Sequence, residues 1–111
     1  MKKIMIFLVI GSFLVTTLAF AGSERERIKS FCQDKWGSNY NMVEHCMEEQ
    51  IEGYRKVKEF VEKADSKNSK PMKKISVHCM NKWELPKFGT HNWNMVDHCM
   101  GEQMEAYQNI Q

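Results

Sequence analysis

The residues most able to do chemistry in this chain are four cysteines and the polar side chains beside them. The cysteines are Cys32, Cys46, Cys79 and Cys99, and the tripeptide His-Cys-Met encloses three of them, at residues 45–47, 78–80 and 98–100. Thiolate, thioether and imidazole groups together suit copper. Adjacent side chains on a helix diverge by about 100°, however, so one tripeptide cannot direct all three groups at one ion. This argument counts against a copper site within one tripeptide.

A second polar set combines one imidazole with two carboxylates, and it occurs twice. The two sets are His45, Glu49 and Glu52, and His98, Glu102 and Glu105. At positions i, i+4 and i+7 the three side chains share one face of a helix, away from the cysteine face. Imidazole and carboxylate groups bind divalent ions such as zinc, so each set is a candidate metal site. The alternative is a solvated helix face that carries a His–Glu pair.

Motifs of enzymes and of covalently bound cofactors do not occur in the sequence. It has no Cys-x-x-Cys, no Cys-x-x-Cys-His and no glycine-rich phosphate loop. Lys2 and Lys3 contribute two of the 16 basic side chains, and the remaining ones equal the 14 acidic side chains in number. The chain without these two lysines is therefore neutral, which gives no electrostatic reason to expect a polyanion as partner. We therefore predict no enzyme activity, no cofactor and no nucleic-acid partner.

All four cysteines belong to a repeat, which occupies residues 30–57 and again residues 77–110. Each copy has Cys-x3-Trp, a gap, and then an aromatic residue followed by Asn-Met-Val, an acidic residue, and His-Cys-Met-x2-Gln-x3-Tyr. Apolar residues recur at helical spacing on both sides of each gap, so each copy predicts two helices. Asn41 and Asn94 are the predicted N-caps of the helices after the gaps, with Glu44 and Asp97 three residues further on.

Two helices joined by a short gap form a hairpin, and each hairpin contains one cysteine pair at equivalent positions. This equivalence favours Cys32–Cys46 and Cys79–Cys99, although four cysteines allow three connectivities and sequence alone excludes none. The predicted fold is all-α: two tandem disulfide-stapled helical hairpins, packed as a small four-helix arrangement with approximate two-fold symmetry. The predicted hairpins span residues 22–64 and 71–111, with a polar linker at 65–70.

Aromatic and glutamine residues at helical spacing from the cysteines are predicted to be structural. Trp36, Tyr54, Trp83 and Tyr107 are expected to pack around the disulfides. Gln50 and Gln103 are expected to satisfy backbone groups of the gaps between the helices.

The beginning of the chain has the layout of a secretory signal peptide. Met1-Lys2-Lys3 is followed by an apolar run from Ile4 to Leu18 and by Ala19-Phe20-Ala21. This pattern predicts a signal peptide over residues 1–21, cleaved after Ala21. An uncleaved anchor is the alternative, but the apolar run is barely long enough to span a bilayer. We predict a periplasmic or secreted protein with no membrane span after cleavage, in a compartment where disulfides form.

The pattern Cys-x3-Trp, followed by Met-Val-x2-Cys-x3-Gln, resembles one that small exported bacterial proteins carry once or twice. The resemblance covers both repeats and implies no particular activity. The function predicted from the sequence is that of an exported, non-enzymatic interaction or envelope-associated module with an unknown protein partner. Two alternatives stay open: a periplasmic metal- or haem-binding protein, and a secreted antimicrobial or immunity peptide. The neutral charge disfavours the last, because membrane-active helices are usually cationic.

Overall fold

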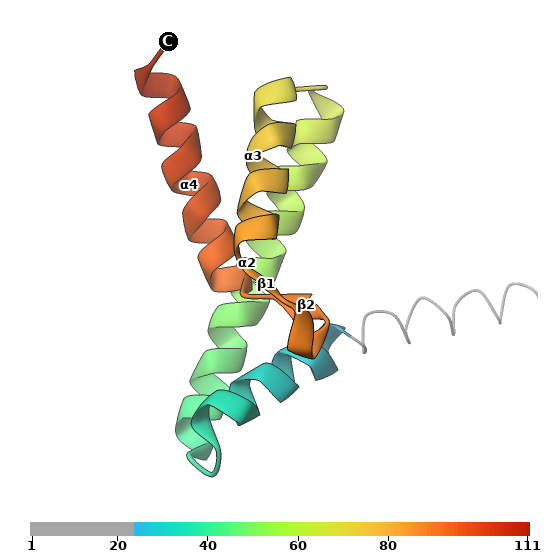
Figure 1. Ribbon diagram of the computed structural model, residues 1–111, viewed down its shortest axis with the longest axis vertical. Coiled ribbons are helices and arrows are strands. Elements are labelled where there is room, and N and C mark those ends of the chain that lie inside the picture. Colours follow the sequence, from blue (N-terminus) through green and yellow to red (C-terminus); the bar gives the residue numbers. More distant parts are fainter. Residues whose placement is uncertain (1–23) are drawn as a thin grey trace, which may run out of the picture.

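The computed structural model describes residues 24–111, which form four α-helices and one short two-stranded connection (Figure 1). The helices are residues 24–36, α2 (Tyr40–Ser66), α3 (Lys70–Lys82) and α4 (Trp93–Asn109); between α3 and α4 lie β1 (Glu84–Leu85), a 3-10 turn (Pro86–Phe88) and β2 (Thr90–His91). The all-α prediction is confirmed. Among the helices of these residues, none has the length and apolar character needed to cross a membrane. The predicted signal peptide lies outside the described residues.

Two disulfides join the helices of the two hairpins, with the predicted pairing. Cys32–Cys46 connects the first helix to α2, and Cys79–Cys99 connects α3 to α4; the Cα atoms of each pair are 5.7 Å apart. Gly37, with φ at 56°, ends the first helix in the left-handed conformation that glycine adopts without strain.

The linker between α2 and α3 is shorter than predicted, because both helices extend into it. Only residues 67–69 separate α2 from α3, whereas residues 65–70 were predicted as linker.

The N-caps of α2 and α4 are Asn39 and Asn92, so the prediction of Asn41 and Asn94 was wrong by two residues. The Asn39 side chain accepts a hydrogen bond from the Met42 amide at 3.3 Å. The equivalent bond from the Met95 amide to Asn92 is 3.4 Å long. An N-cap side chain binds the amide three residues further on, and Asn39 and Asn92 satisfy this spacing. Asn41 and Asn94 lie in the first turn instead.

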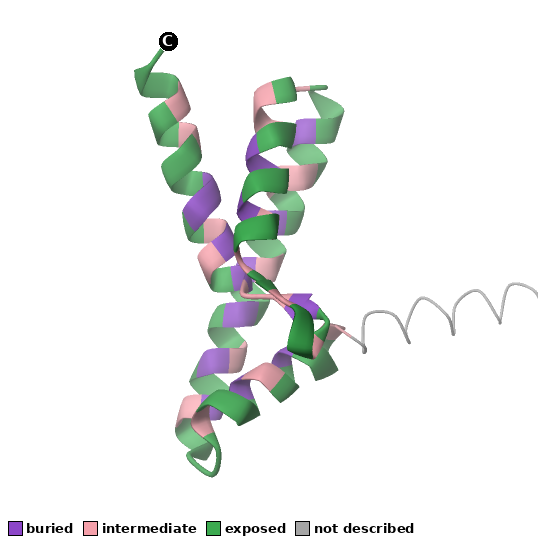
Figure 2. Ribbon diagram, in the orientation of Figure 1, coloured by how far each residue is buried: buried purple, intermediate pink, exposed green. Residues whose placement is uncertain are grey.

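Buried residues follow the sides on which the helices face one another (Figure 2). The buried core comprises both disulfides together with Ile28, Val43, Val57, Ile75, Trp93, Val96 and Met100. The four aromatic side chains predicted to surround the disulfides are partly buried and pack against this core: Trp36, Tyr54, Trp83 and Tyr107. The predicted packing of these four side chains against the core is therefore confirmed, although all four are only partly buried.

The two hairpins follow each other head to tail, so the predicted two-fold symmetry is wrong (Figure 1). The cause is α2, whose 27 residues form one continuous helix that is linked to the first helix by the Cys32–Cys46 disulfide and also packs against α3. The start of α4 packs on the middle of α2, and there Trp93 is only 6% exposed. Its equivalent in the first repeat, Tyr40, is 74% exposed. A two-fold axis would give these two residues the same surroundings.

Candidate functional site

The indole of Trp93 occupies a socket at the open end of the first hairpin. This Trp93 socket is formed by Glu24, Gln50, Gly53 and Tyr54. The indole Nε1 donates a hydrogen bond to Glu24 Oε1 at 2.8 Å, and the centre of the Tyr54 ring lies 4.9 Å from that of Trp93. An aromatic side chain with a satisfied N–H thus connects the second repeat to the first.

Gln50 binds the N-terminus of α4 from α2. Its Oε1 accepts hydrogen bonds from the amides of Trp93 at 2.7 Å and Asn94 at 3.4 Å. Its Nε2 donates to Asn92 Oδ1 at 2.9 Å. The first amides of a helix have no partner within the helix, so Gln50 satisfies two of them. Gln50 was predicted to satisfy backbone groups of a gap, but the amides that it binds belong to the first turn of α4. Gln103, for which the same role was predicted, is exposed.

Gly53 allows the backbone of α4 to approach α2 closely. A Cβ atom at this position would lie 2.6 Å from the carbonyl carbon and oxygen of Trp93, and 2.7 Å from the Asn94 amide nitrogen. These atoms belong to the backbone and cannot move aside as a flexible side chain can. The packing of the two repeats therefore requires glycine at residue 53.

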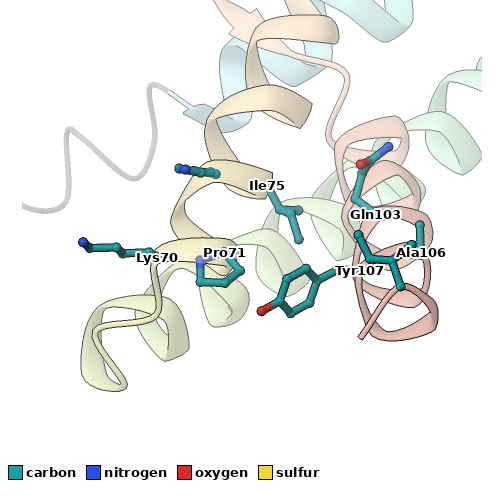
Figure 3. Close-up of a pocket in the computed structure, with 8 residues that line it drawn as sticks. Lys70, Pro71, Ile75, Gln103, Ala106 and Tyr107 are labelled. Carbon is teal, nitrogen blue, oxygen red and sulfur yellow. The ribbon is translucent and has the colours of Figure 1, made fainter.

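Helices α3 and α4 diverge toward the end of the chain (Figure 1), and a cleft lies between them. The cleft has a volume of about 400 Å³ and is lined by Lys70, Pro71, Lys74, Ile75, Gln103, Ala106, Tyr107 and Ile110. We call this set of residues the open cleft. In Figure 3 the side chains of Ile75 and Tyr107 point into the space between the two helices. The interior of the cleft is mostly apolar, and its polar groups include the two lysines and Gln103.

The open cleft is the second repeat's counterpart of the Trp93 socket. When the repeats are aligned on their cysteines, Gln103, Ala106 and Tyr107 stand where α2 has Gln50, Gly53 and Tyr54. Ile75 likewise stands where the first helix has Ile28. Within residues 24–111, however, no aromatic residue fills the open cleft as Trp93 fills its socket, and Gln103 is exposed. The open cleft thus keeps the glutamine and the tyrosine of the Trp93 socket, whereas Pro71 and Ala106 stand where the socket has Glu24 and Gly53.

Sequence reasoning did not identify the Trp93 socket or the open cleft. It placed Gln50, Tyr54 and their counterparts in a structural stripe and did not single out Trp93 or Gly53. A usable signal was the alignment of the two copies, which pairs Tyr40 with Trp93 and Gly53 with Ala106.

The predicted histidine–glutamate sets are exposed and are only partly brought together. His45 lies 3.0 Å from Glu49, and the equivalent distance from His98 to Glu102 is 2.9 Å. Glu52 instead binds Arg55 at 2.6 Å, and this hydrogen bond lowers the pKa of the Glu52 carboxyl. Glu105 is exposed. In the part of the chain that the structure describes, no three His, Cys, Asp or Glu side chains lie close enough to hold a metal ion.

The His-Cys-Met tripeptides have no thiolate available for a metal ion. Cys46, Cys79 and Cys99 are all in disulfides, and residues 24–111 contain no free cysteine. A disulfide sulfur lacks the negative charge that makes a cysteine thiolate a strong ligand.

Zinc is a direct probe of the histidine–glutamate sets. We expect titration with zinc to give no saturable heat in calorimetry, because Arg55 holds the third carboxylate of the first set and two exposed ligands leave the ion open to water. The paired variant His45→Ala, His98→Ala is the control. A rise in melting temperature with zinc that this variant abolishes would contradict the expectation and establish a metal site.

Comparison of the chain with models of protein families, with curated proteins and with solved structures found no match. The function is therefore inferred from the chemistry of the molecule itself. Its fold and sites define a disulfide-stapled helical repeat protein with one filled aromatic socket and one open counterpart.

Proposed function

We propose that this chain is a small, exported, non-enzymatic module that binds a protein partner in its open cleft. The observation that carries the proposal is the Trp93 socket, in which equivalent positions already bind an aromatic side chain and a helix N-terminus. Trp93 makes hydrogen bonds there through its backbone amide and through its indole. The second repeat keeps the glutamine and the tyrosine of this arrangement, as Gln103 and Tyr107.

The chemistry of the open cleft suits the start of a partner helix. There an apolar side chain lies beside backbone amides that have no hydrogen-bond partner within the helix. Ile75 and Tyr107 provide apolar surface, and Gln103 is an exposed amide that can accept hydrogen bonds from the first turn of a partner helix. Lys70 and Lys74 add positive charge at the cleft. A buried aromatic anchor surrounded by polar groups is the usual centre of a protein–protein interface.

The proposed export is supported by the two disulfides together with the signal-peptide pattern of residues 1–21. Disulfides persist in oxidising compartments such as the periplasm or the extracellular space. A binding module in such a compartment gains from covalent links, because a chain of this size has only a small core.

Site-specific photo-crosslinking in cells that export the protein tests this function. A photoreactive phenylalanine analogue at Ile110, on the cleft, is expected to form a covalent adduct with a polypeptide. The same analogue at Val77 serves as the matched control, since Val77 is also an exposed aliphatic residue but lies outside the cleft. Adducts at residue 110 and none at residue 77 would support the proposal. Equal adducts at both positions, or none at either, would contradict it.

A further inference from the structure

We propose that the partner of the open cleft is a second copy of this chain, which inserts Tyr40 at the start of its α2. The inference rests on the proposed function, because it names the occupant of the same cleft. Tyr40 is the repeat equivalent of Trp93, the residue that fills the Trp93 socket. It is also 74% exposed, which makes it one of the most exposed large apolar side chains among residues 24–111.

The start of α2 matches the start of α4 in the groups that the Trp93 socket binds. Asn39 is an N-cap as Asn92 is, so the first turns of both helices begin in the same way. Gln50 satisfies the amides of the first two residues of α4, whereas no residue of the described chain accepts a hydrogen bond from the amides of Tyr40 and Asn41. Gln103 of a second copy occupies the position from which it can accept both bonds.

The charges around Tyr40 complement those at the cleft. The surface groove beside Tyr40 is lined by Val43, Met47 and Ile51 together with Glu44, Glu48 and one arginine, Arg25. The open cleft contributes Lys70 and Lys74 and no acidic side chain. Opposite charges of this kind favour one orientation of two copies and weaken with added salt.

Two differences between the repeats limit the strength of this contact. Pro71 stands where the Trp93 socket has Glu24, which accepts the indole hydrogen bond, so the open cleft lacks this acceptor. Ala106 stands where the Trp93 socket has Gly53, and a Cβ atom at residue 53 would come within 2.6 Å of the backbone of the bound helix. The helix of a second copy must therefore lie farther from α4 than α4 lies from α2. We expect association between copies to be weaker than the packing of the two repeats within one chain.

The proposed contact joins two different surfaces, so it does not end at a dimer. Each copy presents Tyr40 at one end and an open cleft at the other, and a contact of this heterologous kind continues into a ring or a filament. Sedimentation of the protein, purified after export with both disulfides formed, is expected to show a mass that rises beyond twice the monomer with concentration. Added salt is expected to lower this mass.

Two variants isolate the two surfaces. Tyr40→Ala removes the inserted side chain, and Ala106→Arg obstructs the cleft; both residues are exposed, so each variant is expected to keep the far-ultraviolet circular dichroism of the wild type. Each alone is expected to sediment as a monomer, with association weakened by about tenfold or more. An equimolar mixture is expected to form a one-to-one dimer and nothing larger, because only one competent cleft and one competent Tyr40 remain.

Ala106→Gly and Val77→Ala complete the design. Ala106→Gly is expected to tighten association, because it restores the close approach that Gly53 allows, and Val77→Ala is expected to change nothing. Wild type that stays monomeric at all concentrations, or single variants whose mixture does not dimerise, would overturn the proposed self-association. A cleft crosslink at Ile110 to a different polypeptide would then leave the proposed function standing, whereas absence of any crosslink would contradict both.

Discussion

Removal of the Cys32–Cys46 disulfide, by changing both cysteines to alanine, is expected to lower the free energy of unfolding by about 2–5 kcal/mol. The bridge closes a loop with a sequence separation of 14 residues, and its loss returns conformational entropy to the unfolded chain. Cys32 is fully buried, so alanine there also leaves a small cavity in the core. Urea denaturation of the wild type and of the double variant measures the difference.

The Cys79–Cys99 disulfide is expected to stabilise the protein about as much as the Cys32–Cys46 disulfide. Cys79 and Cys99 are separated by 20 residues, so the entropic effect of the two bridges differs by only about 0.3 kcal/mol in the chain-entropy model. The double variant Cys79→Ala, Cys99→Ala is therefore expected to lose a similar amount. A loss below about 1 kcal/mol from either pair would show that the hairpin does not depend on its disulfide.

The hairpins and their disulfides were predictable because their signals are local and repeated. Helical periodicity, an asparagine near each gap and one cysteine pair per copy all lie within short segments. The N-caps were misplaced by two residues because both copies read Asn-x-Asn at residues 39–41 and 92–94, and either asparagine of a pair can cap a helix. The hydrogen bonds that the Met42 and Met95 amides donate to Asn39 and Asn92 distinguish them.

The arrangement of the hairpins could not be predicted in the same way. A repeat of two similar units is compatible with two-fold packing and with head-to-tail packing. The choice depends on the length of α2 and on contacts between residues more than forty positions apart, such as Gln50 with Trp93. Such contacts leave no periodic signal in the sequence. The open cleft results from head-to-tail packing. Because the sequence did not predict this packing, it did not predict the cleft either.

Gly53→Ala is expected to destabilise the protein by about 1–3 kcal/mol, although alanine is the better helix former by about 1 kcal/mol. The added methyl group would meet the carbonyl group of Trp93 and the amide of Asn94, and these atoms are part of the capped first turn of α4. To avoid the methyl group, the first turn of α4 must move away from α2. This movement breaks its hydrogen bonds to Gln50 and withdraws the Trp93 indole from the Trp93 socket. Thermal and urea denaturation measure the loss, and protection from hydrogen exchange in the first turn of α4 is expected to fall with it.

Gly101→Ala is the matched control, because Gly101 lies within α4 and a Cβ atom there would meet nothing within 4 Å. The same substitution at this position is expected to stabilise the protein by about 0.5–1 kcal/mol through helix propensity alone. The two variants make the same chemical change in a helix, so the difference between them measures the close approach of the repeats. Stabilisation by both would mean that α4 can shift away from α2 at little cost. Ala106 would then be no obstacle in the open cleft, and Ala106→Gly would not tighten the association of two copies.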